Sequence, residues 1–435
     1  MKSFRIILPA CMIVSALAAT AAQAQEGSAV VAFGANEHGQ CEARRTVVGA
    51  VQVSAGDHSV ALRGDGSLAA WGLNDSGQCN VPANLGPVAF IGTGLNHTLA
   101  GLRDGTVRAW GWNADGQCNV PQGLNDAIQV EGGWRQSAAL RKDGTVIGWG
   151  SNQFNMSTIP AGLNSVRQIS LRWAHGVAVK NDGTVVGWGS NFAGEGTVPT
   201  GLAGVKQISA GAYHNIVLTA GDRVRCWGAG TTDTGEYYEF GQSIVPPEAS
   251  FAVAVAAGYE HSVALLKNGS IRIWGTIEAR SGYGCGAGGP DDDCDGPIES
   301  RITSIFAGCH HTLAIKAAPA TIGGVIPAAG SATGGVDVTI TGENFLPSSQ
   351  VFFDEVPAES IQWISPTRLS ARTPSKRAGA FTGFVTVRVD NASAPDAFYG
   401  VSSCPNDIDG DGEVGNSDVS LLLLDFGNCA RGQPE

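Results

Sequence analysis

The chain has 435 residues, enough for two or three domains, and 43% of them are hydrophobic while only 15% are charged, a balance that excludes wholesale disorder. The formal net charge is −12, and an acidic chain repels the phosphates of nucleic acids and of anionic membrane surfaces, so we expect neither as a partner. Glycine is abundant, at 61 residues, which predicts frequent turns and, together with runs of Val, Ile, Thr and Trp, an all-β fold.

Residues 1–24 have the features of an export signal. Lys2 and Arg5 precede an apolar stretch, and the stretch ends in Ala22-Gln23-Ala24, the small-x-small pattern of a signal-peptidase site. No other segment is long and apolar enough to cross a bilayer. We therefore expect a soluble, secreted product that is cleaved near Ala24.

A repeat organises residues 28–317. A Trp-Gly step recurs through this segment, and a second marker, nearly always His, precedes it within each unit. Both markers are separated by 39 residues four times in succession and by longer intervals afterwards. The first marker is found at Trp71, Trp110, Trp149, Trp188, Trp227 and Trp274, with Phe33 as a degenerate copy, and the second at His58, His97, Gln136, His175, His214, His261 and His311.

The sequence pattern of a unit predicts three short strands. The last two strands are joined by a tight hairpin such as Asp104-Gly105. Three short strands cannot bury both of their faces alone, but radial stacking of such sheets buries them and leaves only short edges. The first unit supplies only a final strand, Val30 to Gly34, and the seventh, Ile305 to Lys316, lacks that strand. Pairing the two predicts a closed, seven-bladed β-propeller.

The repeat resembles a known family. Ala55 to Leu62 and Ala257 to Leu265 carry its Ala-Gly…His-Ser-x-Ala-Leu pattern, and they are followed by Asp-Gly or Asn-Gly hairpins and Trp-Gly steps. This combination resembles the RCC1 (regulator of chromosome condensation) repeat. The short unit and the Gly-Gln-Cys-Asn-Val-Pro loops (Gly77 to Pro82, Gly116 to Pro121) are more similar to a secreted bacterial branch that includes propellers of the β-lactamase inhibitor protein II type. The resemblance implies the fold, whereas the family hosts several functions.

The order of the strands predicts a binding face. Turns between first and second strands share one rim with the loops after each Trp-Gly step, and two insertions, Thr231 to Phe240 and Ile277 to Pro297, fall on the same rim. Aromatic residues and Arg are the usual anchors of protein contacts, although packing between blades is the alternative for the single Trp residues. The candidate partner-binding residues are Trp112, Trp134, Arg135, Trp173, Tyr213, Tyr237, Tyr238 and Tyr259.

The histidines do not indicate an active site, because nearly all of them occupy one repeat position at which Gln136 replaces His. A His bonded between blades is the simpler interpretation, and we find no nucleophile elbow, zinc motif or phosphate loop. We therefore expect that the chain is not an enzyme.

One of the ten cysteines lies in the leader, which leaves an odd number in a compartment that permits disulfides. We expect two pairs, because Cys285 and Cys294 flank a short acidic insertion and Cys404 and Cys429 bracket the tail. The pairing of Cys226 and Cys309 stays open. Cys41, Cys79 and Cys118 recur at one repeat position, too far apart to bond, and are interpreted as small buried apolar residues.

The composition changes after Lys316. Segments such as Phe384 to Val389 alternate apolar and polar residues, as half-buried strands do. Pro327, Gly334-Gly335 and Thr339 to Phe345 give residues 319–400 a resemblance to the IPT/TIG domain, an immunoglobulin-like β-sandwich.

The tail, residues 404–429, carries a calcium-loop pattern. Its carboxylates occupy loop positions 1, 3, 5 and 12, a Gly occupies position 6, and position 7 offers a backbone carbonyl, which is the oxygen-rich set that Ca²⁺ prefers. A short helix is expected to follow the loop. The segment resembles one half of a dockerin repeat, and the absence of a second half puts cohesin-type docking in doubt. The expected Ca²⁺ ligands are Asp407, Asp409, Asp411, Glu413 and Asp418.

These observations predict a secreted, non-enzymatic protein that binds a protein or a glycan through one propeller rim. An inhibitor of a secreted enzyme is the first alternative, since the resemblance includes inhibitors. A guanine-nucleotide exchange factor is the second, and export counts against it. Neither the partner nor the oligomeric state follows from the sequence.

Overall fold

The computed structural model describes residues 28–42, 47–235, 238–276, 301–331, 334–374, 383–390 and 392–401. The chain divides into two compact units between Ala318 and Pro319, and each unit is described by itself. Over the described ranges, no helix has both the length and the apolar character that a membrane crossing requires.

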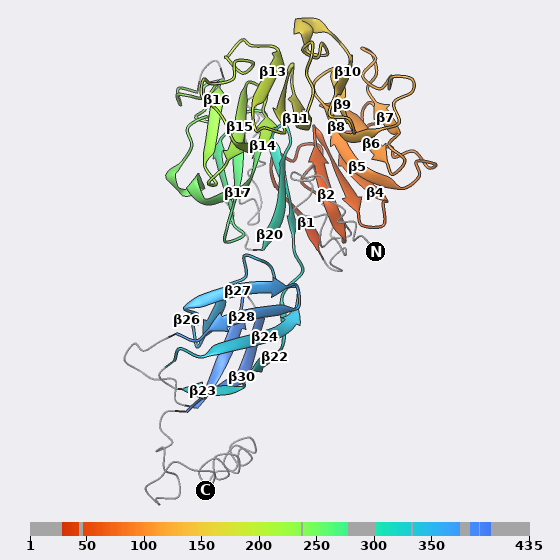
Figure 1. Ribbon diagram of the computed structural model, residues 1–435. Helices are drawn as coiled ribbons and strands as arrows, with labels where there is room; N and C mark the ends of the chain where they lie inside the picture. Colours follow the sequence, from red (N-terminus) through yellow and green to blue (C-terminus); the bar gives the residue numbers. More distant parts are fainter. Residues whose placement is uncertain are drawn as a thin grey trace, which may run out of the picture. The chain divides into compact units, whose positions relative to one another are not determined.

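The first unit consists of seven three-stranded antiparallel sheets, or blades, arranged around a central axis (Figure 1). The first strand of each blade is innermost and contacts the first strands of its two neighbours. Two short 3-10 helices, Gln153–Asn155 and Pro247–Phe251, lie in the connections.

Blade 1 contains β2 (Ala50–Ala55), β3 (His58–Arg63) and β4 (Leu68–Gly72); blade 2 contains β5 (Val88–Thr93), β6 (His97–Leu102) and β7 (Val107–Gly111); blade 3 contains β8 (Ala127–Gly132), β9 (Gln136–Arg141) and β10 (Val146–Gly150); blade 4 contains β11 (Val166–Arg172), β12 (His175–Lys180) and β13 (Val185–Gly189); blade 5 contains β14 (Val205–Ala210), β15 (His214–Thr219) and β16 (Val224–Gly228); blade 6 contains β17 (Ala252–Ala257), β18 (His261–Leu266) and β19 (Ile271–Gly275); blade 7 contains β20 (Ile302–Ala307), β21 (His311–Lys316) and β1 (Ala29–Gly34).

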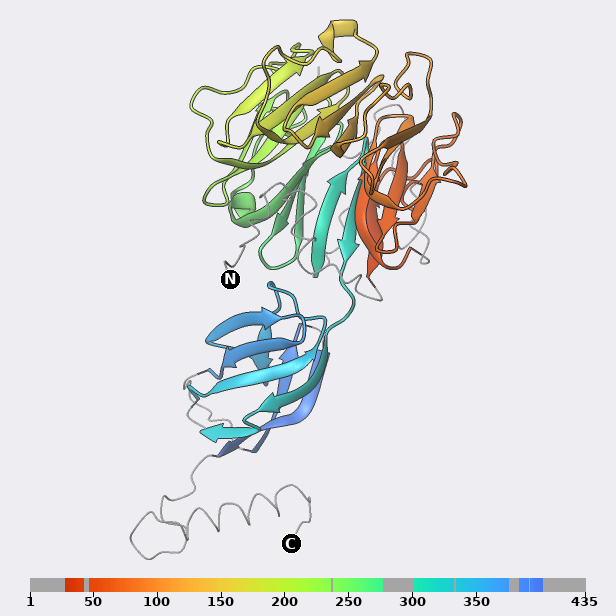
Figure 2. The ribbon, with the colours of Figure 1, turned by 45° about the vertical axis from the view of Figure 1, so that its right-hand side comes forward.

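Blade 7 closes the ring. Its outer strand, β1, comes from the beginning of the unit and pairs antiparallel with β21, from Ala29 opposite Lys316 to Gly34 opposite His311. Its inner strand, β20, contacts β17 on one side and β2 on the other, as the turned view allows the reader to follow (Figure 2). The prediction of a seven-bladed ring that is shut by its two ends is therefore confirmed.

Local chemistry fixes the hairpins between second and third strands. In blade 2 the Asp104 carboxylate accepts hydrogen bonds from the Thr106 backbone N–H (2.9 Å) and the Thr106 hydroxyl (2.7 Å). Gly105 adopts φ +83°, a left-handed conformation that side chains other than glycine's rarely adopt. The Asp-Gly pairs of blades 1, 3 and 4 repeat this turn.

The marker histidines join neighbouring blades by buried hydrogen bonds. Nε2 of His58 lies 2.7 Å from the Thr98 hydroxyl of the next blade, and the Thr98 hydroxyl donates to the Gln78 carbonyl (2.8 Å). A hydroxyl has one proton, so it must accept from His58, and we assign the proton of the imidazole to Nε2. The same step crosses the closing seam, where Nε2 of His311 lies 2.9 Å from the Ser59 hydroxyl.

The bond to a hydroxyl is replaced at two of the seven marker positions. Nε2 of His175 lies 3.0 Å from the side-chain amide oxygen of Asn215, and the second case explains Gln136. Blade 4 carries Gly176 at the hydroxyl position, because a Cβ there would lie 2.3 Å from the ring of Trp188. With no hydroxyl to reach, Gln136 of blade 3 donates instead to the Trp173 carbonyl (3.0 Å). The His-to-Gln change therefore accompanies the loss of the hydroxyl acceptor in the next blade.

Arg172 connects the two sides of the ring across its centre. It ends the inner strand of blade 4, is only 6% exposed, and donates to the carbonyls of Ala55 in blade 1 (2.9 Å) and Ala307 in blade 7. Those two blades form the closing seam. A guanidinium has five N–H donors in a fixed fork, so it can bond both sides of the seam at once.

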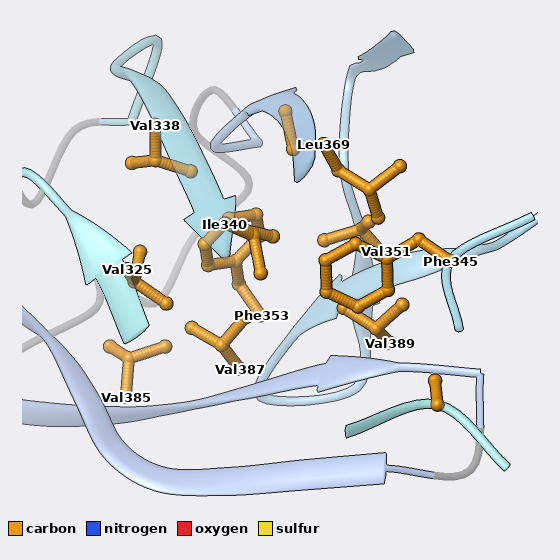
Figure 3. Packing of buried hydrophobic residues seen from close by; sticks show 12 residues of the cluster. Val325, Val338, Ile340, Phe345, Val351, Phe353, Leu369, Val385, Val387 and Val389 are labelled. Atoms are coloured by element: carbon orange, nitrogen blue, oxygen red, sulfur yellow. The ribbon is translucent and has the colours of Figure 1, made fainter. Parts of the chain in front are cut away.

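The second unit is a sandwich of two sheets, as predicted for an immunoglobulin-like domain. Their facing surfaces form one apolar core in which the Ile340 and Phe353 side chains are fully buried (Figure 3). The Trp363 indole N–H donates to the Phe345 carbonyl at its border (2.9 Å). One sheet has the order β22 (Thr321–Ile326), β24 (Asp337–Glu343), β28 (Arg368–Arg372) and β27 (Ser360–Ser365), and the other has the order β23 (Ala329–Ser331), β30 (Ala392–Val401), β29 (Gly383–Val389), β25 (Val351–Phe353) and β26 (Val356–Pro357).

The buried histidines predict acid sensitivity. Burial lowers the pKa of His58 to about 4 and the pKa values of His97, His214 and His311 to about 3. In the unfolded chain these groups titrate near ~6.5, so below that pH the unfolded state binds more protons and the free energy of unfolding falls. Each such histidine should contribute a slope of about 1.4 kcal/mol per pH unit between the two pKa values.

Urea denaturation at pH 7.5, 6.0 and 5.0 should show this loss, and the variant His97→Gln should reduce the slope by about one histidine's share. An unchanged slope in that variant would contradict the assignment of a neutral imidazole.

Replacing Arg172 should loosen the seam. The variant Arg172→Met leaves the Ala55 and Ala307 carbonyls without their charged donor, which should lower the free energy of unfolding by about 2–5 kcal/mol. The measurement is chemical denaturation, with Arg108→Met on an exposed outer strand as the control. Equal, small effects of both substitutions would show that Arg172 does not hold the ring together.

Candidate protein-binding rim

The antiparallel strands give the propeller two different rims. One rim, here called the turn rim, contains the turns between first and second strands and the loops that begin after each Trp-Gly step. The other, the hairpin rim, contains the hairpins between second and third strands. The last strand of the unit, β21, runs from the turn rim toward the hairpin rim, so the chain leaves the propeller at the hairpin rim.

The turn rim carries a continuous aromatic cluster. Trp134 and Trp173 stack with ring centroids 4.5 Å apart and planes at 7°. Trp173 meets Tyr259 edge to face at 5.3 Å, and Tyr213 stacks on Tyr238 at 3.9 Å. Tyr213 and Tyr259 also contact each other edge to face, at 6.1 Å. These side chains come from blades 3 to 6 and the loop after blade 5, so residues far apart in the sequence form one surface feature.

Arg135 extends the cluster toward blade 2. Its guanidinium carbon lies 4.0 Å from the ring centroid of Trp134 and 5.5 Å from that of Trp112, which are cation–π distances. Nε of Arg135 is 3.7 Å from the carboxylate of Asp115. The structure thus brings seven of the eight candidate rim residues together, and the eighth, Tyr237, lies outside the described residues.

The cluster has a packed base and exposed edges. Tyr213 is 6% exposed, and burial raises the pKa values of the Tyr213 and Tyr259 hydroxyls. Tyr238 is 42% exposed. Trp112, Trp134 and Trp173 are half-buried, which is compatible with packing between blades and with partner contact alike, whereas Tyr238 presents a ring to solvent.

Two further phenylalanines were not predicted. Phe192 is 76% exposed and Phe154 is 41% exposed, and their rings meet edge to face at 5.2 Å. They lie in the loops after blades 4 and 3. Ala193, the neighbour of Phe192, packs against the buried group that contains Tyr213, as Trp173 does, so this pair borders the aromatic cluster. The sequence signal was available, since both residues follow Trp-Gly steps in polar loops.

Trp173 holds a strained backbone at the middle of the cluster. Its φ is +45°, in the left-handed region that costs a residue with a side chain about 1–2 kcal/mol. Its carbonyl accepts two hydrogen bonds, from the Trp134 N–H (2.8 Å) and from the Gln136 side chain. These inter-blade bonds compensate the strain and fix the ring of Trp173 against that of Trp134.

Burial shifts the pKa of two carboxyl groups, those of Glu131 in β8 and of Asp57 in the turn of blade 1. Loss of hydration raises the pKa of Glu131 to about 7, against the opposing effects of a hydrogen bond from Gln129 and the charge of Arg172. Burial likewise raises the pKa of Asp57, although Cys309 and His310 favour its charged form. Among the described residues, no group of three or more His, Cys, Asp and Glu side chains is arranged to hold a metal ion.

Five cysteines fall within the described ranges, and each is a free thiol: Cys41, Cys79, Cys118, Cys226 and Cys309. The first three are partly exposed, where we expected small buried residues, and each donates to a loop carbonyl, as Cys41 does to Ala35 (3.2 Å). Burial of the sulfur raises the pKa of the Cys41 thiol to about 12, which disfavours the reactive thiolate.

Some expected sites lie outside the described residues. They are the cysteines Cys285, Cys294, Cys404 and Cys429 and the calcium ligands Asp407, Asp409, Asp411, Glu413 and Asp418.

Comparison with known proteins agrees with this architecture. Residues 50–78, 88–117, 205–232 and 252–285 match the Regulator of chromosome condensation (RCC1) repeat, and residues 320–404 match the IPT/TIG domain. No curated protein matches the chain.

Solved structures share the propeller fold at low sequence identity. Prp20p from Saccharomyces cerevisiae is 19% identical with a TM-score of 0.51, over 68% of this chain and 92% of Prp20p. Human WBSCR16 is 17% identical with a TM-score of 0.51, over 67% of this chain and 99% of WBSCR16. Identities this low concern the fold alone. The first unit of this chain is therefore a propeller that contains RCC1 repeats over the four matched segments, and the second contains an IPT/TIG domain.

Proposed function

We propose that this chain is an exported, non-enzymatic interaction protein and that the turn rim of its propeller binds a protein partner. The observation that carries the proposal is the aromatic cluster with its exposed edges at Phe154, Phe192 and Tyr238. Aromatic side chains offer large, rigid contact areas and are the residues on which binding energy concentrates. The structural neighbour Prp20p is itself described by its binding to Gsp1p and histones, both of which are proteins.

The buried histidines and the Cys309 thiol have structural environments that support a binding role over catalysis. Six of the seven marker positions are buried histidines that bond a group in the next blade, and the low pKa values of His58, His97, His214 and His311 keep those imidazoles neutral. The Cys309 thiol is buried, and burial raises its pKa further above the ordinary value. Neither group is disposed for the proton transfers of a hydrolase.

Inhibition of a secreted enzyme would use the same rim and is the second candidate, because an aromatic patch backed by a rigid ring suits tight, pre-organised docking. The exchange-factor alternative is less compatible with export, which would separate the protein from a cytosolic or nuclear partner.

The test is capture of partners from the extracellular fraction of producing cells by wild-type protein and by a Phe192→Ser/Tyr238→Ala variant. Loss of two exposed anchors should weaken capture by at least about tenfold while the thermal midpoint stays unchanged. Val48→Ser, which alters an exposed apolar residue beside the start of β1 at the hairpin rim, is the matched control.

Undiminished capture by the double variant would place the partner elsewhere. An enzyme that loses activity when captured would favour inhibition over scaffolding.

We also propose that the tail binds one Ca²⁺ through Asp407, Asp409, Asp411, Asp418 and the backbone carbonyl of Glu413. Asp407→Ala/Asp409→Ala should lower Ca²⁺ affinity by more than about a hundredfold in calorimetric titration of the full chain, because it removes two of the hard oxygen ligands. Equal affinity of the variant and the wild type would refute the site.

A further inference from the structure

Among the described residues, the two rims of the propeller differ in their balance of charge. Within the described part of the turn rim, acidic residues occur in the loops after blades 7, 1, 2, 4 and 5 and in the turns of blades 1 and 6. Arg135 is the one Lys or Arg among the described residues of these turns and loop beginnings, and it pairs with Asp115. The acidic residues of these turns and loops are Glu37, Glu42, Asp57, Asp75, Asp115, Glu195, Asp233, Glu239 and Glu260. Glu195 and Glu260 are buried, and burial raises the pKa of Asp57.

Lys and Arg side chains are concentrated at the hairpin rim. Every described hairpin between second and third strands carries at least one Lys or Arg, and the inner strands of blades 4, 5 and 7 begin next to another. Most of these cations have an Asp of the same hairpin beside them. The hairpin cations are Arg63, Arg103, Arg141, Lys142, Lys180, Arg223 and Lys267.

The acidic residues surround the aromatic cluster. Asp233 is exposed in the loop that also carries Tyr238, and Asp115 lies beside Arg135 at the other end of the cluster. Glu37 acts electrostatically on His310, whose ring is 5.2 Å from that of Tyr259.

Two positive charges lie near the cluster, and they offset only part of this negative potential. Arg135 is held over Trp134 and Trp112, and Arg172 is buried against backbone carbonyls.

We infer that the partner of the turn rim presents a basic surface, with Lys or Arg side chains around apolar or aromatic groups. This inference rests on the proposed function and adds the chemistry of the partner to it. The apolar groups would meet Phe192 and Tyr238, and the cations would meet Glu37, Asp75 and Asp233. An acidic partner would face the like charges of Glu37, Asp75 and Asp233, which costs affinity and slows association.

The acidic residues beside the aromatic cluster act mainly before the partner makes contact. Clefts and rims lined by one sign of charge raise the encounter rate of an oppositely charged protein, and this effect declines as the ionic strength increases. The aromatic residues, in contrast, act after contact and should set the dissociation rate. Substitution of the acidic residues should therefore change the association rate, whereas substitution of the aromatic residues should change the dissociation rate.

The experiment selects binders from a random peptide library displayed on phage, with the full chain as the target and with Phe192→Ser/Tyr238→Ala used to discard binders that do not need the rim. Rim-dependent binders should be enriched in Lys and Arg together with aromatic or branched apolar residues. The association rate of the strongest peptide should then fall at least about threefold on Glu37→Gln/Asp233→Asn at low salt.

The control Asp65→Asn/Glu248→Gln removes the same net charge at exposed positions on the hairpin-rim side of the propeller and should leave that rate unchanged. The inference would be overturned if rim-dependent binders showed no enrichment in Lys and Arg, or if the two charge variants had equal association rates. In either case the proposal that the turn rim binds a protein would still stand. A library that yields no rim-dependent binder would count against the proposed function as well.

Discussion

The closure of blade 7 is the constraint on which the rest of the propeller depends. A ring of sheets has no free edge only if its last sheet contacts its first, and here β1 supplies the strand that the end of the repeat array lacks. Around the ring, each blade is bonded to the next by a buried imidazole or amide. At the seam this bond runs from His311 to Ser59, and Arg172 adds a second connection by holding one carbonyl on each side. An open superhelix could satisfy none of these seam contacts.

The bonds between blades also explain why the repeat keeps its particular residues. The carbonyl of Gln78 accepts hydrogen bonds from both the Thr98 hydroxyl and the Trp110 indole N–H, each within 2.9 Å. Histidine, hydroxyl, tryptophan and loop carbonyl therefore form one buried unit. Removing any member would leave a polar group unpaired away from water, which costs about 1–3 kcal/mol. The markers that reveal the repeat in the sequence are thus the groups that join one blade to the next.

Much of this architecture could be predicted from the sequence, because a fixed period is informative whatever the local conformation. The number of blades, the closing strand and the rim that would gather Trp134, Trp173 and Tyr213 all follow from strand order alone. How closely these rings stack could not be predicted, since stacking depends on the angle between neighbouring blades. Arg172 was missed although it follows Gly94 and Gly133 at the 39-residue interval. A cation at a glycine position is visible in the sequence, but its reach across the axis requires the closed ring.

The same glycine position shows how a rigid ring can carry a variable surface. A Cβ at Gly94 would lie 2.0 Å from the ring of His97, so in blade 2 the imidazole leaves no room for a side chain there, whereas blade 4 has Arg172 at this position. The next two residues of each turn are free of that constraint and differ from blade to blade, for example Trp134-Arg135 and Tyr259-Glu260. Because hydrogen bonds between blades fix the backbone on both sides of the turn, these pairs can change without disturbing the fold. The exposed side chains of the adjoining loops, Phe192, Tyr238 and Asp233, therefore report on what the rim contacts, since the packing of the ring does not require them.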